Sequence, residues 1–147
     1  MATTTRMTFE QFLQLPEDDM NYELNEGELL VTPSPTPYHN IARLRLAQAL
    51  NLFVSDHRLG LVLDGTDFRL GPNTGRRPHV AFLSARRFSG LNLHQSPVEG
   101  APTLAVEIIS PTNSALDMMR KVHQYLNAAE CQVVWVLYPL LNFAGRP

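Results

Sequence analysis

Leu104-Ala105-Val106-Glu107-Ile108-Ile109-Ser110-Pro111 is the segment with the strongest structural signal in this sequence. It is an apolar, strand-like run with one acidic residue, and a turn signal and a helix-like segment containing Lys121 follow it. A buried strand rarely holds a carboxylate among branched apolar residues unless a partner or a metal neutralises it. Glu107 is therefore the first candidate for a functional residue.

The segments on either side of this run predict an α/β fold. A central strand over 103–109 precedes a helix that Thr112 or Asn113 caps and that runs to about Ala129. The near-continuous apolar run 132–137 is typical of an interior strand. A strand, a helix and a strand in this order predict a right-handed parallel crossover.

The first half of the chain adds helices and antiparallel strands. We expect a helix over 9–14, a hairpin over 22–31, and a long helix that begins with Thr36 as its N-cap and ends near Asp56. Further strands are expected over 61–63, 66–70 and 79–83, a loop over 71–75, and irregular structure over 85–98. Together these elements predict a mixed β-sheet with helices on its faces.

The composition limits the class of protein. The 147 residues, 44% hydrophobic and 18% charged, are expected to form a single domain over 1–147. The net charge of −2 excludes a uniformly basic nucleic-acid-binding protein. Cys131 is the only cysteine, and the first residues do not resemble a signal peptide, so a cytoplasmic location is expected. No apolar run is long enough to span a bilayer, so no membrane partner is expected.

The strand pattern is compatible with metal-dependent phosphodiester hydrolysis. That chemistry needs acidic oxygens that hold Mg²⁺ or Mn²⁺ at one point, and a nearby cation helps. Strands 79–83 and 103–109 can each present one ligand at the same sheet edge, and Lys121 follows on the next helix.

Several motifs resemble one known family in their order and spacing. They are the start at 7–12, the hairpin at 22–29, Pro33-Ser34-Pro35 before His39, the strand at 67–70, the segment Val106–Pro111, and the helix positions Asp117, Lys121, Tyr125, Ala128 and Ala129. From about Thr8 to Pro139 the chain is similar to the Uma-two-type restriction endonucleases, a branch of the PD-(D/E)XK nuclease superfamily.

This resemblance implies a restriction-endonuclease-like mixed sheet flanked by helices, and an endonuclease that cleaves DNA with Mg²⁺ or Mn²⁺. It assigns the second active-site acid to Glu107 and the catalytic lysine to Lys121. The position of the first acid falls on His79, as a catalytic residue and metal ligand. Glu23 is a further candidate metal ligand, because these nucleases often add an acid from an N-terminal element. The resemblance also implies DNA as partner and suggests a homodimer.

Three departures from the family pattern predict a weakened or inactive enzyme. His79 replaces an aspartate, and imidazole suits Zn²⁺, Ni²⁺ or Mn²⁺ better than Mg²⁺. Tyr138 stands where an acid commonly precedes the proline. The sequence ends early, so a C-terminally truncated fold is expected, whose apolar residues Leu140, Leu141 and Phe143 could pack on a neighbouring subunit.

Simpler interpretations apply to the same residues. Glu107 could be a core carboxylate paired with an arginine, His79 a partly buried histidine, and Glu23 a structural or solvated residue. Asp117 and Lys121 could form a solvent-facing helix pair.

Four arginines flank the strand that begins at His79. They are Arg76, Arg77, Arg86 and Arg87. They could bind DNA phosphates, with Arg76 and Arg77 as the leading candidates, or belong to an ordinary surface. The alternative function is therefore a catalytically inactive module that binds DNA or a protein.

Overall fold

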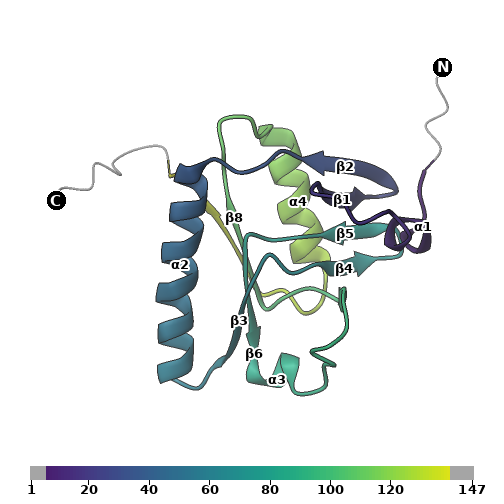
Figure 1. The fold of residues 1–147 in the computed structure, drawn as a ribbon. Helices are drawn as coiled ribbons and strands as arrows, with labels where there is room; N and C mark the ends of the chain where they lie inside the picture. Colours follow the sequence, from purple (N-terminus) through teal and green to yellow (C-terminus); the bar gives the residue numbers. More distant parts are fainter. Residues whose placement is uncertain (1–5, 140–147) are drawn as a thin grey trace.

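The computed structural model describes residues 6–139, and Figure 1 shows their fold. The predictions about Leu140, Leu141 and Phe143 lie outside these residues. In chain order the elements are α1 (Phe9–Leu13), β1 (Asn21–Asn25), β2 (Glu28–Thr32), α2 (Pro37–Asp56), β3 (Gly60–Asp64), β4 (Phe68–Gly71), β5 (Thr74–Arg76), β6 (Val80–Ser84), α3 (Ala85–Phe88), β7 (Val98–Glu99), β8 (Leu104–Ile108), α4 (Ala115–Asn127) and β9 (Val133–Leu137).

The strands form two mixed sheets, whereas the sequence predicted one. The first sheet has the order β2-β1-β5-β4-β7, and the second has the order β3-β6-β8-β9. Each contains one parallel pair, β4 with β7 and β8 with β9, among antiparallel pairs. The mixed α/β class is confirmed.

The β8-α4-β9 unit is the parallel crossover that the sequence predicted, with Leu104 opposite Val133 and Ile108 opposite Leu137. Two details of the prediction are wrong. The helix begins later, because the hydroxyl of Ser114 accepts the backbone N–H of Asp117 and makes Ser114 the N-cap. In the described part of the chain β9 is an edge strand, and three of its side chains are still half-buried.

The long helix α2 agrees with its prediction at both ends. Thr36 caps it, Pro37 occupies the first turn, and Asp56 is its last residue. The predicted loop 71–75 is wrong in part, because residues 74–76 pair with β1 and β4 as the short strand β5. The region predicted as irregular contains α3 and β7.

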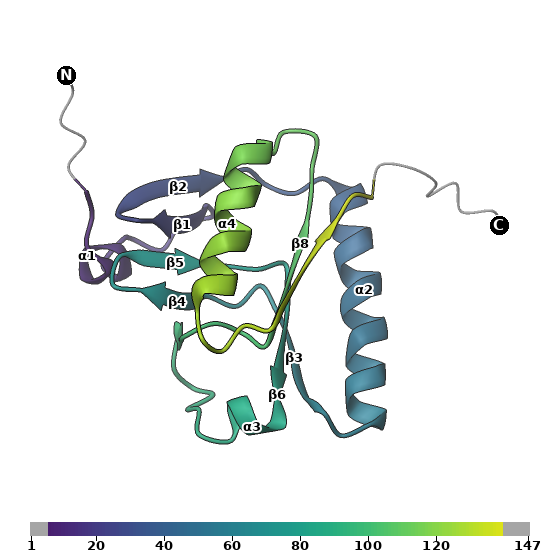
Figure 2. The ribbon, with the colours of Figure 1, turned by 180° about the vertical axis from the view of Figure 1, so that it is seen from behind.

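Helices α2 and α4 pack on opposite faces of the second sheet (Figures 1 and 2). On the α2 side, Val80, Leu104 and Val106 form a buried cluster with side chains of α2. On the other side, Ala105 and Tyr125 are buried together, so α4 covers that face. Among residues 6–139 no helix has the length and apolar character needed to cross a membrane.

Candidate functional site

The alternation of β8 places Glu107 on the side of the sheet that α4 covers. Leu104 and Val106 point toward α2, so Ala105 and Glu107 point the opposite way. The Glu107 side chain is completely buried. A carboxylate in that position needs hydrogen-bond donors or cations around it.

Three side chains surround the Glu107 carboxylate. Its Oε1 atom lies 2.9 Å from the Lys121 ammonium and accepts a 2.9 Å hydrogen bond from the Tyr125 hydroxyl. Its Oε2 atom lies 2.8 Å from Nδ1 of His79. Lys121 and Tyr125 are four residues apart on α4, so one face of the helix supplies both contacts.

These contacts determine the protonation state of Glu107. Burial raises the pKa of the carboxyl group, but the charge of Lys121 and the hydrogen bond with His79 outweigh it and hold the pKa at about 2. Glu107 is therefore ionised at neutral pH. Burial and the nearby Glu107 charge together raise the pKa of Tyr125 well above its ordinary value, so Tyr125 is a neutral donor.

Lys121 connects Glu107 to Glu23, which lies on β1 in the other sheet. The ammonium is 2.9 Å from Oε1 of Glu23, as close as it is to Glu107. Burial lowers the pKa of Lys121, but the two carboxylates raise it by more, so the ammonium stays charged. Asp117 pairs with Arg120 instead, at 3.6 Å, so the solvent-facing Asp117–Lys121 pair is wrong.

The amino-acid composition also distinguishes Lys121, and the motifs described above did not use this observation. Lys121 is the only lysine in the 147 residues, against eleven arginines. The other cationic side chains of this protein are arginines. Its one lysine, whose ammonium is more compact than a guanidinium, lies between two buried carboxylates.

His79 presents one ring nitrogen to the protein. Its Nδ1 atom lies 2.8 Å from Glu107 Oε2 and 3.1 Å from the backbone nitrogen of Ile108. One nitrogen cannot donate to the carboxylate and accept from the amide at the same time. The ionised carboxylate and the shorter distance favour a proton on Nδ1, and the ring itself is partly exposed.

His39 is the member of this region that the sequence analysis did not select as a site residue. It lies in the first turn of α2, is buried, and contacts the Ile108 carbonyl oxygen through Nε2 at 3.2 Å. Its ring meets the His79 ring edge-on, with 4.5 Å between centroids. Burial, and then the neighbouring His79, lower the pKa of His39, so it is neutral.

Arg76 and Arg77 both have partners within the protein. The buried Arg76 guanidinium contacts Glu23 at 3.2 Å and donates to Gln124 at 2.8 Å. Arg77 pairs with Asp67 at 2.7 Å, and its backbone N–H donates to Glu23. DNA binding by these two arginines stays a prediction, and it requires these contacts to open.

The donor set around Glu107 does not fit a Mg²⁺ ion. Mg²⁺ binds several oxygen ligands, and negatively charged ligands among them balance the charge of the ion. Here Lys121 occupies the space between the two carboxylates, and Arg76 pairs with the far side of Glu23. Within residues 6–139, no three His, Cys, Asp or Glu side chains are arranged to hold a metal ion.

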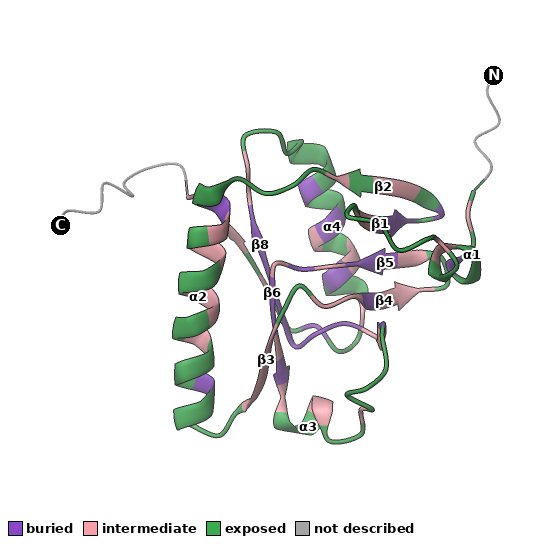
Figure 3. Ribbon diagram, viewed as in Figure 1, coloured by how far each residue is buried: buried purple, intermediate pink, exposed green. Residues whose placement is uncertain are grey.

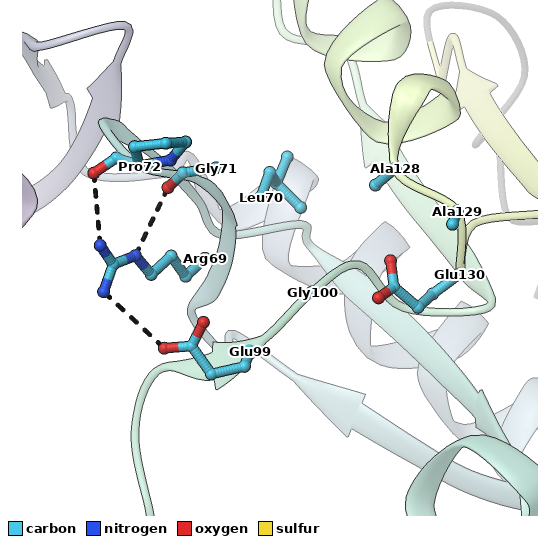
Figure 4. A pocket seen from close by; sticks show the side chains of 9 residues that line it. All are labelled: Arg69, Leu70, Gly71, Pro72, Glu99, Gly100, Ala128, Ala129 and Glu130. Carbon is cyan, nitrogen blue, oxygen red and sulfur yellow. Dashed lines mark hydrogen bonds and ion pairs between the residues drawn. The ribbon is translucent and has the colours of Figure 1, made fainter.

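A surface pocket of about 450 Å³ lies away from these residues (Figure 4). Arg69 borders it and donates to the carbonyl oxygens of Gly71 and Pro72. Leu70, Glu99, Gly100, Ala128, Ala129 and Glu130 complete its lining. The pocket contains no member of the Glu107 cluster.

Comparison with known proteins assigns the chain to a family. The Uma2 family model, described as "Putative restriction endonuclease", matches residues 9–140. This chain belongs to the Uma2 family. The resemblance that the sequence motifs indicated is thereby confirmed. No curated protein matches the sequence.

The fold agrees with a solved structure described as a putative nuclease belonging to DUF820 from Anabaena variabilis. The TM-score is 0.79 and the sequence identity is 21%, over 90% of this Uma2 chain and 74% of the other. Identity at this level establishes the shared fold alone.

Proposed function

We propose that this Uma2 protein derives from a metal-dependent DNA endonuclease and that its cleavage of DNA in Mg²⁺ is weak or absent. The family membership supports the nuclease origin. The observation that carries the proposal is the convergence of Glu23, Glu107, Lys121 and His79, from both sheets and α4, on one point. These are the acids and the lysine that the resemblance assigned to the active site, with His79 in the position of the first acid.

The proposed loss of Mg²⁺ activity follows from the charge at position 79. An aspartate there would place a second carboxylate beside Glu107, and the repulsion between the two would favour a bound cation. The imidazole at position 79 adds no second carboxylate, and its Nδ1 atom lies 2.8 Å from Oε2 of Glu107. The Lys121 ammonium then neutralises Glu107 and Glu23 in place of a metal.

A plasmid-cleavage assay in Mg²⁺ and in Mn²⁺ tests this proposal. We expect no cleavage by the wild type in Mg²⁺, cleavage by His79→Asp, and none by the double variant His79→Asp/Glu107→Gln. His94→Asp, at an exposed histidine, is the matched control and should behave like the wild type. Strong wild-type cleavage in Mg²⁺ that survives Glu107→Gln would overturn the proposed site.

DNA binding without cleavage is the second candidate function, because the charges of the cluster already balance. Two carboxylates, Glu23 and Glu107, face two cations, Lys121 and Arg76. Fluorescence anisotropy with a labelled duplex should then show binding that weakens steeply as salt increases. Absence of any binding at low salt would exclude this candidate.

A further inference from the structure

Two exposed arginines, Arg58 and Arg86, have no side-chain partner among residues 6–139. Neither guanidinium makes a hydrogen bond or an ion pair with a described residue. Five other arginines each pair with a carboxylate, namely Arg43, Arg69, Arg76, Arg77 and Arg120. The charges of Arg58 and Arg86 are therefore available to a binding partner.

The fold brings these two arginines to one corner of the molecule. Arg58 lies in the turn between α2 and β3, and Arg86 lies in α3, directly after β6. The backbone N–H of Ala85 donates to the Leu59 carbonyl oxygen at 2.8 Å, so the neighbours of the two arginines are bonded to each other. Figure 1 shows this turn and α3 at the same end of the second sheet, and Figure 3 shows that the turn is exposed. Two positive charges are thereby held at one corner.

The backbone of Arg58 has a conformation that arginine rarely adopts. Its φ is +54°, in the left-handed region, where a Cβ atom costs free energy. The N–H groups of Arg58 and Leu59 donate to the carbonyl oxygens of Ser55 and Val54, an arrangement that ends many helices and usually has glycine at this position. Stability alone would favour glycine at position 58, so an arginine there points to a function for its charge.

An exposed aromatic pair lies in the helical turn before Arg58. The centroids of the Phe53 and His57 rings are 4.2 Å apart, and Nδ1 of His57 lies 2.8 Å from the Phe53 carbonyl oxygen. Phe53 is nevertheless 54% exposed. Asp56 is the one acid within 53–58, and the segment 84–98 contains none. Exposed rings beside unpaired cations are the combination with which proteins hold single-stranded nucleic acids.

We propose that this corner, formed by Phe53, His57, Arg58 and Arg86, binds single-stranded DNA. One base stacks on the aromatic pair, and the two guanidinium groups contact neighbouring phosphates. The exposed ring favours a single strand over a duplex, because the faces of bases inside a duplex are already covered by their neighbours.

The choice of DNA as the nucleic acid rests on the proposed function, but the corner is separate from the Glu107 cluster. His79 comes directly before β6 and α3 comes directly after it, so the corner lies at the other end of this strand. Binding there also requires no ion pair to open, unlike binding by Arg76 and Arg77, which pair with acids of the protein.

Fluorescence anisotropy with a labelled thymidine oligonucleotide, measured over a range of salt concentrations, tests the corner. We expect Phe53→Ala to weaken binding by roughly tenfold, because one base loses its stacking partner. Arg58→Gly and Arg86→Gln should each weaken binding and lower the slope of log affinity against log salt by about 0.7. Arg120→Gln, at an arginine paired with Asp117, is the matched control and should leave affinity and slope unchanged.

Arg58→Gly also separates binding from stability. Glycine adopts a positive φ without a Cβ clash, so the melting temperature of this variant should equal or exceed that of the wild type. Weaker binding by a protein of undiminished stability then reports the loss of the guanidinium itself.

Two results would overturn this inference and leave the proposed function standing. One is duplex binding by a wild type that binds no single strand at low salt. The other is loss of single-strand binding in Arg77→Gln but not in Arg58→Gly or Arg86→Gln, which would place the contact at the pair predicted from the sequence. Plasmid cleavage by His79→Asp is measured separately, so its absence would count against the proposed function and not against this corner.

Discussion

Glu107 is the single residue whose surroundings most constrain the chemistry of this protein. A completely buried carboxylate would be strongly unfavourable alone, yet Lys121, Tyr125 and His79 supply a cation and two donors to it. The same contacts that stabilise its charge also use the oxygen atoms that a metal would need. In this structure the Lys121 ammonium is the cation that balances Glu107.

The pKa of Glu107 predicts an acid-sensitive part of the stability. Its folded-state pKa is about 2 and its ordinary value is 4.5, so the unfolded chain takes up the proton more readily. The stabilisation is present above about pH 4.5 and is lost as the pH falls toward about 2. It amounts to something on the order of 3 kcal/mol. Urea unfolding across this pH range should show the loss.

Comparison of two glutamine variants assigns that loss to Glu107. Glu107→Gln should flatten the fall in unfolding free energy below about pH 4.5, because the titrating group is gone. Glu17→Gln, at an exposed position, should keep the wild-type slope. Equal slopes for the wild type and Glu107→Gln would contradict the ionised, buried carboxylate.

Among the elements, the β3–β6 pair depends on one close backbone approach. Gly60 is opposite Ser84 and has φ +152°. A Cβ atom at this position would lie 1.9 Å from the Leu83 carbonyl oxygen, which is backbone and cannot rotate away. The turn from α2 into β3 therefore requires glycine.

Substitution of this glycine has a definite expected effect. Gly60→Ala should lower the free energy of unfolding by roughly 1–3 kcal/mol, because β3 must move away from β6 to admit the methyl group. Gly90→Ala is the matched control, since no atom lies within 4 Å of its Cβ position and its φ is not positive. Thermal or urea unfolding distinguishes the two. A neutral Gly60→Ala would contradict the close approach.

The elements with strong local signals were predictable, and those with weak ones were not. Thr36 and Pro37 mark the start of α2 by capping chemistry that acts within four residues. The strand β5 has three residues and exists because β1 and β4 pair with it, so its own residues do not signal it. The apolar run of β9 predicted an interior strand, but β9 is an edge strand in the described part of the chain, and its Val133 and Trp135 side chains are exposed.

In the whole molecule, the Glu107 cluster joins the two sheets. Glu23 comes from the first sheet and Glu107 from the second, and the Lys121 ammonium lies 2.9 Å from a carboxylate oxygen of each. A cation shared between two buried anions resists separation of the sheets, because separation would expose or unpair each charge.

Removal of that shared cation should weaken the entire fold. Lys121→Met leaves Glu107 buried beside Glu23 without their common counter-charge, and we expect a loss of about 3–5 kcal/mol in unfolding free energy. Hydrogen exchange should increase in both β1 and β8. Arg120→Met, the neighbouring and more exposed position, should have a small effect. Faster exchange in only one of the two sheets would contradict the joining role of Lys121.

The sequence by itself determined the α/β class and the β8-α4-β9 crossover, and it made Glu107 the first candidate for a functional residue. These features depend on local periodicity and on the high free energy of a charge within an apolar run. Both are visible in consecutive residues of the sequence. The tertiary structure alone decided that the strands divide into two sheets, that His39 contacts His79, and that Arg76 turns inward to Glu23. Those features depend on which segments pack against one another in three dimensions, and the two side-chain contacts join residues at least forty positions apart.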